Sequence, residues 1–222
     1  TNPGDLKFYT KSIVGNTITN TFTQSTEKVN VSITKKWEDN SNTNHKRPTS
    51  IKYVLKNGNS VAGEYTATGN QITNNNWSYT FTDLPKYDSH NNEIIYTVEE
   101  QEVNKDDLKF YSKTIGGNYK TGFNITNKFN VPNEKINVKV TKNWDDNNNS
   151  NYKRPQNITI ELKNGNEIVN TTLLTGTENT WEHEFTDLAK YNESGNEINY
   201  TIDEKETNQK DLKFYKSTKT GD

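Results

Sequence analysis

The chain of 222 residues contains neither cysteine nor methionine, which excludes disulfide bonds and thiol chemistry. Hydrophobic residues make up only 28% of it, and no apolar run approaches the length of a membrane span. No positively charged and then apolar segment opens the chain, so we expect it to be a piece of a longer protein. A thin core without disulfides calls for another source of stability.

A strong charge of one sign is also missing. The 27 basic and 29 acidic residues leave a net charge of -2, which gives no electrostatic footprint for nucleic acid or for an anionic membrane surface. Aromatic residues reach 11%, whereas disordered chains usually combine a strong net charge with few aromatics. We therefore expect a folded protein that binds no nucleic acid and does not insert into a membrane.

The sequence repeats itself. KVNVSITKKW at residues 28–37 returns as KINVKVTKNW at residues 135–144, a shift of 107 residues. FTDL at Phe81 returns at Phe185, a shift of 104, so the second copy has lost three residues in between. The chain thus contains two copies of a unit of about a hundred residues, the size of an ordinary domain.

A third landmark shows that the chain is out of phase with its repeat. DLKFY occurs three times, beginning at Asp5, Asp107 and Asp211. We therefore interpret residues 1–24 as the C-terminal strand segment of a preceding repeat. Residues 25–130 are expected to form a complete domain, and residues 131–222 a second domain that lacks its last strand.

Apolar residues alternate with polar ones, which is typical of strands with one buried face. The runs are Val29, Val31, Ile33; Trp77, Tyr79, Phe81; and Ile94, Tyr96, Val98. NG pairs at Asn57 and Asn164 lie between strand-like runs and predict hairpins. We expect an all-β fold of two tandem Ig-like antiparallel β-sandwiches arranged end to end.

The same alternation turns three polar residues toward the core of the first copy. Lys35 continues the run of Ile33, Glu100 continues that of Val98, and Asn127 follows Ile125 at the same spacing. In the second copy the corresponding positions are Lys142 and Glu204, and in the tail Asn20 stands between Ile18 and Phe22.

A buried Lys, Glu and Asn have a chemical rationale. Burial lowers the pKa of a lysine and raises that of a carboxyl, which favours a neutral amine beside a protonated acid. The amine can then attack the Asn carboxamide while the acid polarises its carbonyl and shuttles protons, with release of ammonia. The alternation leaves other interpretations open: a structural ion pair, or a Lys35 that extends to solvent beside a surface pair Glu99 and Glu100.

Several motifs, in order, resemble the B-type repeat domains of Gram-positive collagen adhesins and pilins, the Cna B-type family. They are VSITKKW, the RP after it, NG, W-x-Y-x-F-x-DLPKY, I-x-YTVEE and ITN. The resemblance covers the whole first copy and all but the last strand of the second. It implies a sandwich with an intramolecular isopeptide bond, in which Lys35 is the nucleophile, Asn127 the acceptor and Glu100 the catalytic acid, with Lys142 and Glu204 in the second copy.

The function implied is a structural stalk or spacer in an extracellular, cell-wall-anchored surface protein, with the anchor outside this chain. It is not an enzyme beyond one self-catalysed turnover. The alternative is a binding module that recognises a host matrix ligand. In the stalk interpretation, we expect other parts of the parent protein to contact the host extracellular matrix.

The second copy departs from the family because its Asn strand is missing, while the tail carries such a strand without a domain. We therefore hypothesise that Asn20 of one chain enters the second copy of another and bonds to Lys142. Partners would then be neighbouring repeats or another copy of the same chain. The alternative is that residues 1–24 are only the remainder of the preceding repeat.

Two loops, residues 38–48 and 145–155, are dense in Asp and Asn. Asp39, Asp145 and Asp146 are weak candidates for calcium ligands, because calcium takes oxygen ligands. A turn built on Asx hydrogen bonds is the alternative, and no cofactor is expected.

Overall fold

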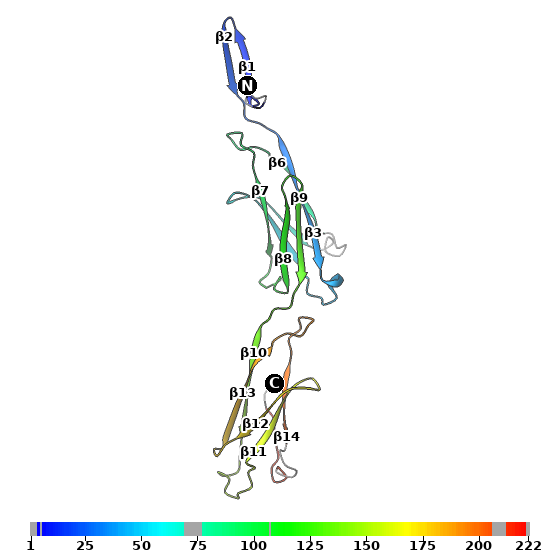
Figure 1. Cartoon of the computed structure of the whole chain (residues 1–222), viewed down its shortest axis with the longest axis vertical. Coiled ribbons are helices and arrows are strands. Elements are labelled where there is room, and N and C mark those ends of the chain that lie inside the picture. The colour runs from blue at the N-terminus through cyan, green and yellow to red at the C-terminus, as the bar shows by residue number, and fades with distance from the viewer. Residues whose placement is uncertain (1–3, 5, 69–76, 107, 206–211, 221–222) are drawn as a thin grey trace. The chain divides into compact units, whose positions relative to one another are not determined.

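The computed structural model describes residues 4, 6–68, 77–106, 108–205 and 212–220 (Figure 1). Its contacts divide the chain into two compact units, Thr1–Asn130 (unit 1) and Val131–Asp222 (unit 2). Asp5, Asp107 and Asp211, which begin the DLKFY segments, lie outside the described residues. Among the described residues, no helix has the length and apolar character needed to cross a membrane.

Unit 1 is built from strands, with one short 3-10 helix at Asn40–Asn42 among its described residues. The strands are β1 (Tyr9–Val14), β2 (Thr17–Phe22), β3 (Lys28–Glu38), β4 (Ser50–Asn57), β5 (Ser60–Thr68), β6 (Tyr79–Pro85), β7 (Tyr96–Glu102), β8 (Tyr111–Asn118) and β9 (Gly122–Phe129). They form a sheet of order β6-β3-β9-β8, a sheet of order β5-β4-β7 and the separate hairpin β1-β2.

The two larger sheets of unit 1 enclose a single core. Val31 and Ile33 of β3, at 0% and 1% exposure, pack in one cluster with Tyr53 and Leu55 of β4, and Trp77 is buried with them. The predicted alternation of inward and outward residues is therefore confirmed. One pairing differs from the predicted antiparallel pattern, because β3 and β9 run parallel, with Lys35 opposite Ile125 and Trp37 opposite Asn127.

Both predicted NG hairpins are present. In β4-β5 the last paired residues are Asn57 and Ser60, and Gly58 has a φ of 57°. In β11 (Asn157–Asn164) and β12 (Glu167–Thr175) the turn is the same, and Gly165 has a φ of 59°. This left-handed conformation is strained for residues with a Cβ, which explains the glycine in each turn.

Unit 2 repeats the sandwich with fewer strands. Besides β11 and β12 it contains β10 (Lys135–Asn143), β13 (Thr180–Ala189) and β14 (Tyr200–Lys205), in sheets of order β10-β13 and β12-β11-β14. Strand β10 corresponds to β3. Within the described part of unit 2, however, β10 pairs with β13 only, whereas β3 pairs with β6 on one side and β9 on the other. One edge of β10 is therefore open.

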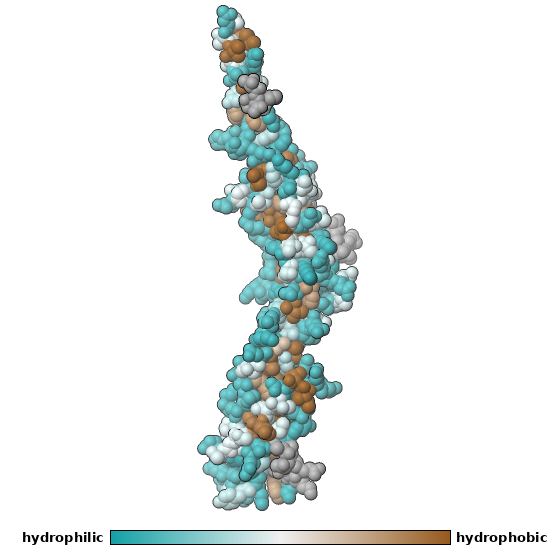
Figure 2. Space-filling view, in the orientation of Figure 1, coloured by the Kyte–Doolittle hydropathy of each residue, from teal (hydrophilic) through white to brown (hydrophobic). Residues whose placement is uncertain are grey.

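The hairpin β1-β2 has the register of β8-β9. Lys11 pairs with Asn20, as Lys113 pairs with Asn127 in unit 1. All its residues are exposed, including the apolar Ile13 and Ile18, and Figure 2 shows apolar surface on this hairpin. Among the described residues, β1 and β2 have no further strand to pair with. A lone two-stranded hairpin of this kind is only marginally stable in water.

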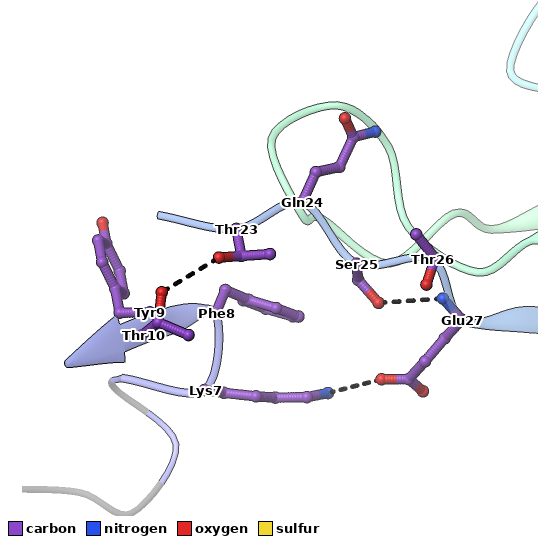
Figure 3. Close-up of a pocket in the computed structure, with 9 residues that line it drawn as sticks. All are labelled: Lys7, Phe8, Tyr9, Thr10, Thr23, Gln24, Ser25, Thr26 and Glu27. Carbon is purple, nitrogen blue, oxygen red and sulfur yellow. Dashed lines mark hydrogen bonds and ion pairs between the residues drawn. The ribbon is translucent and has the colours of Figure 1, made fainter. Parts of the chain in front are cut away.

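The base of the hairpin contacts the rest of unit 1. A shallow pocket there is lined by residues 7–10 and 23–27 (Figure 3). Lys7 Nζ donates to Tyr87 Oη at 2.5 Å and lies 4.0 Å from the Glu27 carboxylate, while the edge of the Phe8 ring meets Tyr87 at 5.1 Å. These contacts hold the start of β1 and leave the strands themselves uncovered.

The open edge of β10 leads to a prediction. We expect backbone amides of β10 to exchange hydrogen faster than those of β3, because β3 is flanked by strands on both sides and opens only with the whole sandwich. Hydrogen exchange followed by mass spectrometry measures this on dilute full chain carrying Asn20→Ala, so that a hairpin from another chain does not cover β10. Equal protection of the two strands would contradict it.

Candidate functional site

The center of unit 1 holds an ion pair between the two sheets. Lys35 projects inward from β3, Glu100 projects inward from β7 of the facing sheet, and Nζ lies 2.7 Å from Oε1. Both side chains are 0% exposed. The interpretation in which Lys35 extends to solvent therefore does not hold.

The surroundings of Lys35 favour a reactive amine. Burial lowers the pKa of Lys35 from 10.5 to about 8; the charge of Glu100 opposes this shift, while those of Lys113 and Arg47 add to it. The lower pKa makes the neutral form of Lys35 more accessible near neutral pH. A neutral amine is the nucleophilic form of lysine.

Asn127 lies on the same inward face. It is 0% exposed on β9, and its Cα is paired with that of Trp37, two residues along β3 from Lys35. Neither Oδ1 nor Nδ2 of Asn127 has a hydrogen-bond partner among the described residues. Leaving a buried polar group unpaired costs about 1–3 kcal/mol, so such a group calls for a functional explanation.

Three further groups at this site were not anticipated from the sequence. Tyr53 of β4 is buried, and its hydroxyl donates to the Trp77 carbonyl at 2.6 Å; burial and, secondarily, the charge of Glu100 raise its pKa. Lys113 Nζ donates to the Glu100 carbonyl at 2.8 Å. Arg47 belongs to the RP motif, and the recurrence of that motif in both copies was the signal that could have identified this residue.

Two of the three calcium candidates are paired with arginine side chains. Arg47 donates from Nε and Nη2 to the two oxygens of Asp39, each at 2.6 Å, and Asp39 Oδ1 also accepts from the backbone of Asn42. Asp146 pairs in the same way with Arg154, and Asp145 is exposed. The described residues contain no cluster of three or more His, Asp or Glu suited to a metal. These loops fit the Asx-turn interpretation.

Unit 2 contains only half of this arrangement. Lys142 Nζ lies 2.9 Å from Glu204 Oε1, but each side chain is 18% exposed, so the predicted burial of this carboxyl is only partial. The reason is the open edge of β10, where no described residue takes the place of Asn127. Asn20, the proposed acceptor, is exposed on β2.

These features define a class: tandem Ig-like β-sandwich repeats with a lysine turned into the core from the first strand. The chain belongs to the family of Cna protein B-type domains, which its residues 31–128 and 138–221 match.

Proteins of Staphylococcus aureus are among those similar to the chain. Over 199 residues, 90% of its length, it is 36% identical to a collagen adhesin of Staphylococcus aureus, of which it spans 16%. A crystal structure of two B repeat units of the collagen binding protein of that organism is 35% identical, with a TM-score of 0.42, and the match covers 89% of this chain and 49% of the other. A single B repeat unit gives 35% identity and a TM-score of 0.38, with coverage of 80% and 86%.

The two ion pairs allow a matched test of burial. In an Asn127→Ala background, where no cross-link can form, we expect Glu100→Ala to lower the free energy of unfolding of unit 1 by about 3–5 kcal/mol, because it leaves a buried ammonium unpaired. Glu204→Ala should cost unit 2 about 1 kcal/mol or less, because that pair is partly solvated. Urea denaturation of each variant measures both; equal losses would contradict the difference in burial.

Proposed function

We propose that this chain is a stalk segment of an extracellular, cell-wall-anchored adhesin, and that unit 1 is stapled by a self-catalysed isopeptide bond between Lys35 and Asn127. The observation that carries the proposal is the fully buried Lys35 and Glu100 pair, beside an Asn127 whose buried amide has no other partner among the described residues. Membership in a family with an adhesin relative supports the stalk role.

The chemistry follows from the residues present. Neutral Lys35 Nζ attacks Cγ of Asn127 while protonated Glu100 donates a hydrogen bond to Oδ1 and polarises the carbonyl. The Nζ–Cγ bond forms and the Cγ–Nδ2 bond breaks. Glu100 accepts a proton from Nζ and delivers one to Nδ2, which leaves as ammonia. The rigid core supplies the proximity, and each chain reacts once.

The position of this bond suits a load-bearing stalk. It would join β3, the first strand of the sandwich, to β9, the last, which lie side by side in Figure 1. Tension entering along β3 would cross from Lys35 to Asn127 and leave through the end of β9. Residues 36–126 would then lie outside the loaded path, so the sandwich need not unfold under force.

Intact mass under denaturing conditions tests the bond. We expect the chain to weigh less than its sequence by one ammonia for unit 1, and Asn127→Ala to show no loss. Asn127→Ala should also lower the stability of unit 1 by about 5 kcal/mol, the chain-entropy contribution of a cross-link that closes a loop of roughly a hundred residues. Asn124→Ala, an exposed position on the same strand, is the matched control and should retain the ammonia loss.

A wild-type chain with the full sequence mass would refute the isopeptide bond.

We also propose that the hairpin β1-β2 of one chain completes unit 2 of another. The hairpin has the register of β8-β9 and uncovered apolar side chains, and β10 has an open edge of the kind that β9 fills beside β3. Placed parallel to β10 in that register, β2 would set Asn20 opposite Trp144, as Asn127 lies opposite Trp37. Lys142 could then attack Asn20 as Lys35 attacks Asn127.

The described residues of unit 2 indicate how much of the hairpin is needed. Tyr215 already packs on Trp144 at 5.0 Å between ring centers, as Tyr111 packs on Trp37 at 4.8 Å. An incoming hairpin would therefore contribute its strands from the residue after Tyr9 onward. Its Tyr9 would compete with Tyr215 for the position beside Trp144. In this proposal residues 1–24 of one chain supply the last strands of a sandwich whose other strands belong to unit 2 of another chain.

Denaturing gel electrophoresis of concentrated protein tests this exchange. We expect a ladder of covalent oligomers that resists boiling in detergent and disappears in Asn20→Ala and in Lys142→Ala. Asn16→Ala, in the exposed turn of the same hairpin, should keep the ladder. Monomer bands alone in the wild type would refute the covalent bond between Asn20 and Lys142.

A further inference from the structure

A network of three side chains surrounds Trp37 next to the lysine. The Asp39 carboxylate accepts two hydrogen bonds from Arg47, at 2.6 Å each, and a third at 3.1 Å from the hydroxyl of Tyr111. The carboxylate of Asp39 is almost completely buried. Burial by itself opposes ionisation of this carboxyl, but the bonds from Arg47, Asn42 and Tyr111 lower its pKa. The network therefore keeps a fixed negative charge inside unit 1.

Two members of this network, Tyr111 and Arg47, contact Trp37. The Tyr111 ring meets the indole edge to face at 4.8 Å, and the Arg47 guanidinium lies 5.4 Å from the ring center. Lys35 Nζ lies 4.4 Å from the same ring. The indole nitrogen has no hydrogen-bond partner among the described residues, so packing and the two cations set the position of the ring.

Unit 2 has the same network, although no described strand pairs with the second edge of β10. Tyr215 Oη donates to Asp146 at 3.0 Å, Arg154 Nε donates to the same carboxylate at 2.9 Å, and Lys142 Nζ lies 4.5 Å from the Trp144 ring. The interactions thus recur where no described residue stands in the place of Asn127. The network belongs to the lysine side of the site and does not depend on the closing strand.

We infer that Asp39, Arg47 and Tyr111 are positioning residues for isopeptide formation, which hold Trp37 as a wall that keeps water from the Lys35 amine while the Asn strand adds. This inference rests on the proposed cross-link in unit 1. None of the three forms or breaks a bond: they act through Trp37, and Arg47 also places a positive charge near the amine.

The pH profile distinguishes this role from simple support of the fold. Lys35 faces Glu100 from β7, Lys113 from β8 and Arg47 from the loop before β4, and Tyr53 lies near Glu100. The reaction needs a neutral amine beside a protonated acid, so Lys35 and Glu100 must together hold one proton. As the pH rises, the rate of isopeptide formation should stay level and then fall once the pair loses that proton, near the pKa of about 8. Admitting water to the amine raises its pKa toward the ordinary value and moves this fall to higher pH.

The test uses the full chain recovered unfolded in urea, before any bond can form, and refolded into buffers that span the fall. Ammonia loss from unit 1 is followed by intact mass, in an Asn20→Ala background that removes exchange between chains. We expect Tyr111→Phe and Asp39→Asn to slow the reaction at least about tenfold and to shift the fall in rate to higher pH. Arg47→Lys, which keeps the charge but not the paired bonds, should be intermediate.

Tyr79→Phe, which alters a ring outside the network, is the matched control and should react like the wild type. If Tyr111→Phe and Asp39→Asn lose only thermal stability, with unchanged rate and pH profile, the inference is wrong although the cross-link stands. A wild-type chain that never loses ammonia would overturn both the cross-link and this inference.

Discussion

The ammonium of Lys35, buried against the carboxylate of Glu100, is the constraint on which the rest of unit 1 depends. Removing a charge from water is costly unless a partner is placed close to it, and here the partner comes from the opposite sheet. A slip of β3 by one residue would turn Lys35 outward and leave Glu100 alone in the core. The pair therefore favours the register of β3 in which Lys35 faces the opposite sheet, and it also supplies the candidate chemistry.

Units 1 and 2 form a natural comparison, because the same lysine occurs with and without a neighbouring closing strand. The lysine and glutamate side chains are 0% exposed in unit 1 and 18% exposed in unit 2, although both pairs are in contact. The closing strand thus contributes dehydration as well as the Asn side chain. Trp37 and Trp144 keep their positions in both units, so the wall next to the lysine forms independently of that strand.

A chain with 28% hydrophobic residues and no cysteine has few ways to become resistant to force or proteases. A larger core and disulfides are both absent, and the described residues hold no metal cluster. The proposed amide between β3 and β9 would provide this resistance with ordinary lysine and asparagine side chains. It would act on the unfolded state as a disulfide does, by shortening the free chain, and would not depend on an oxidising environment.

The sequence by itself determined which residues face inward, because alternation along a strand is a local property. Val31, Ile33, Lys35 and Glu100 were placed in this way, and the NG pairs located two hairpins. Only the tertiary structure decided which groups meet. It brought Glu100 to Lys35, paired β3 with β9 in parallel, placed Arg47 against Asp39, and left Lys142 partly exposed. Those outcomes depend on contacts between strands far apart in the chain, which no local pattern encodes.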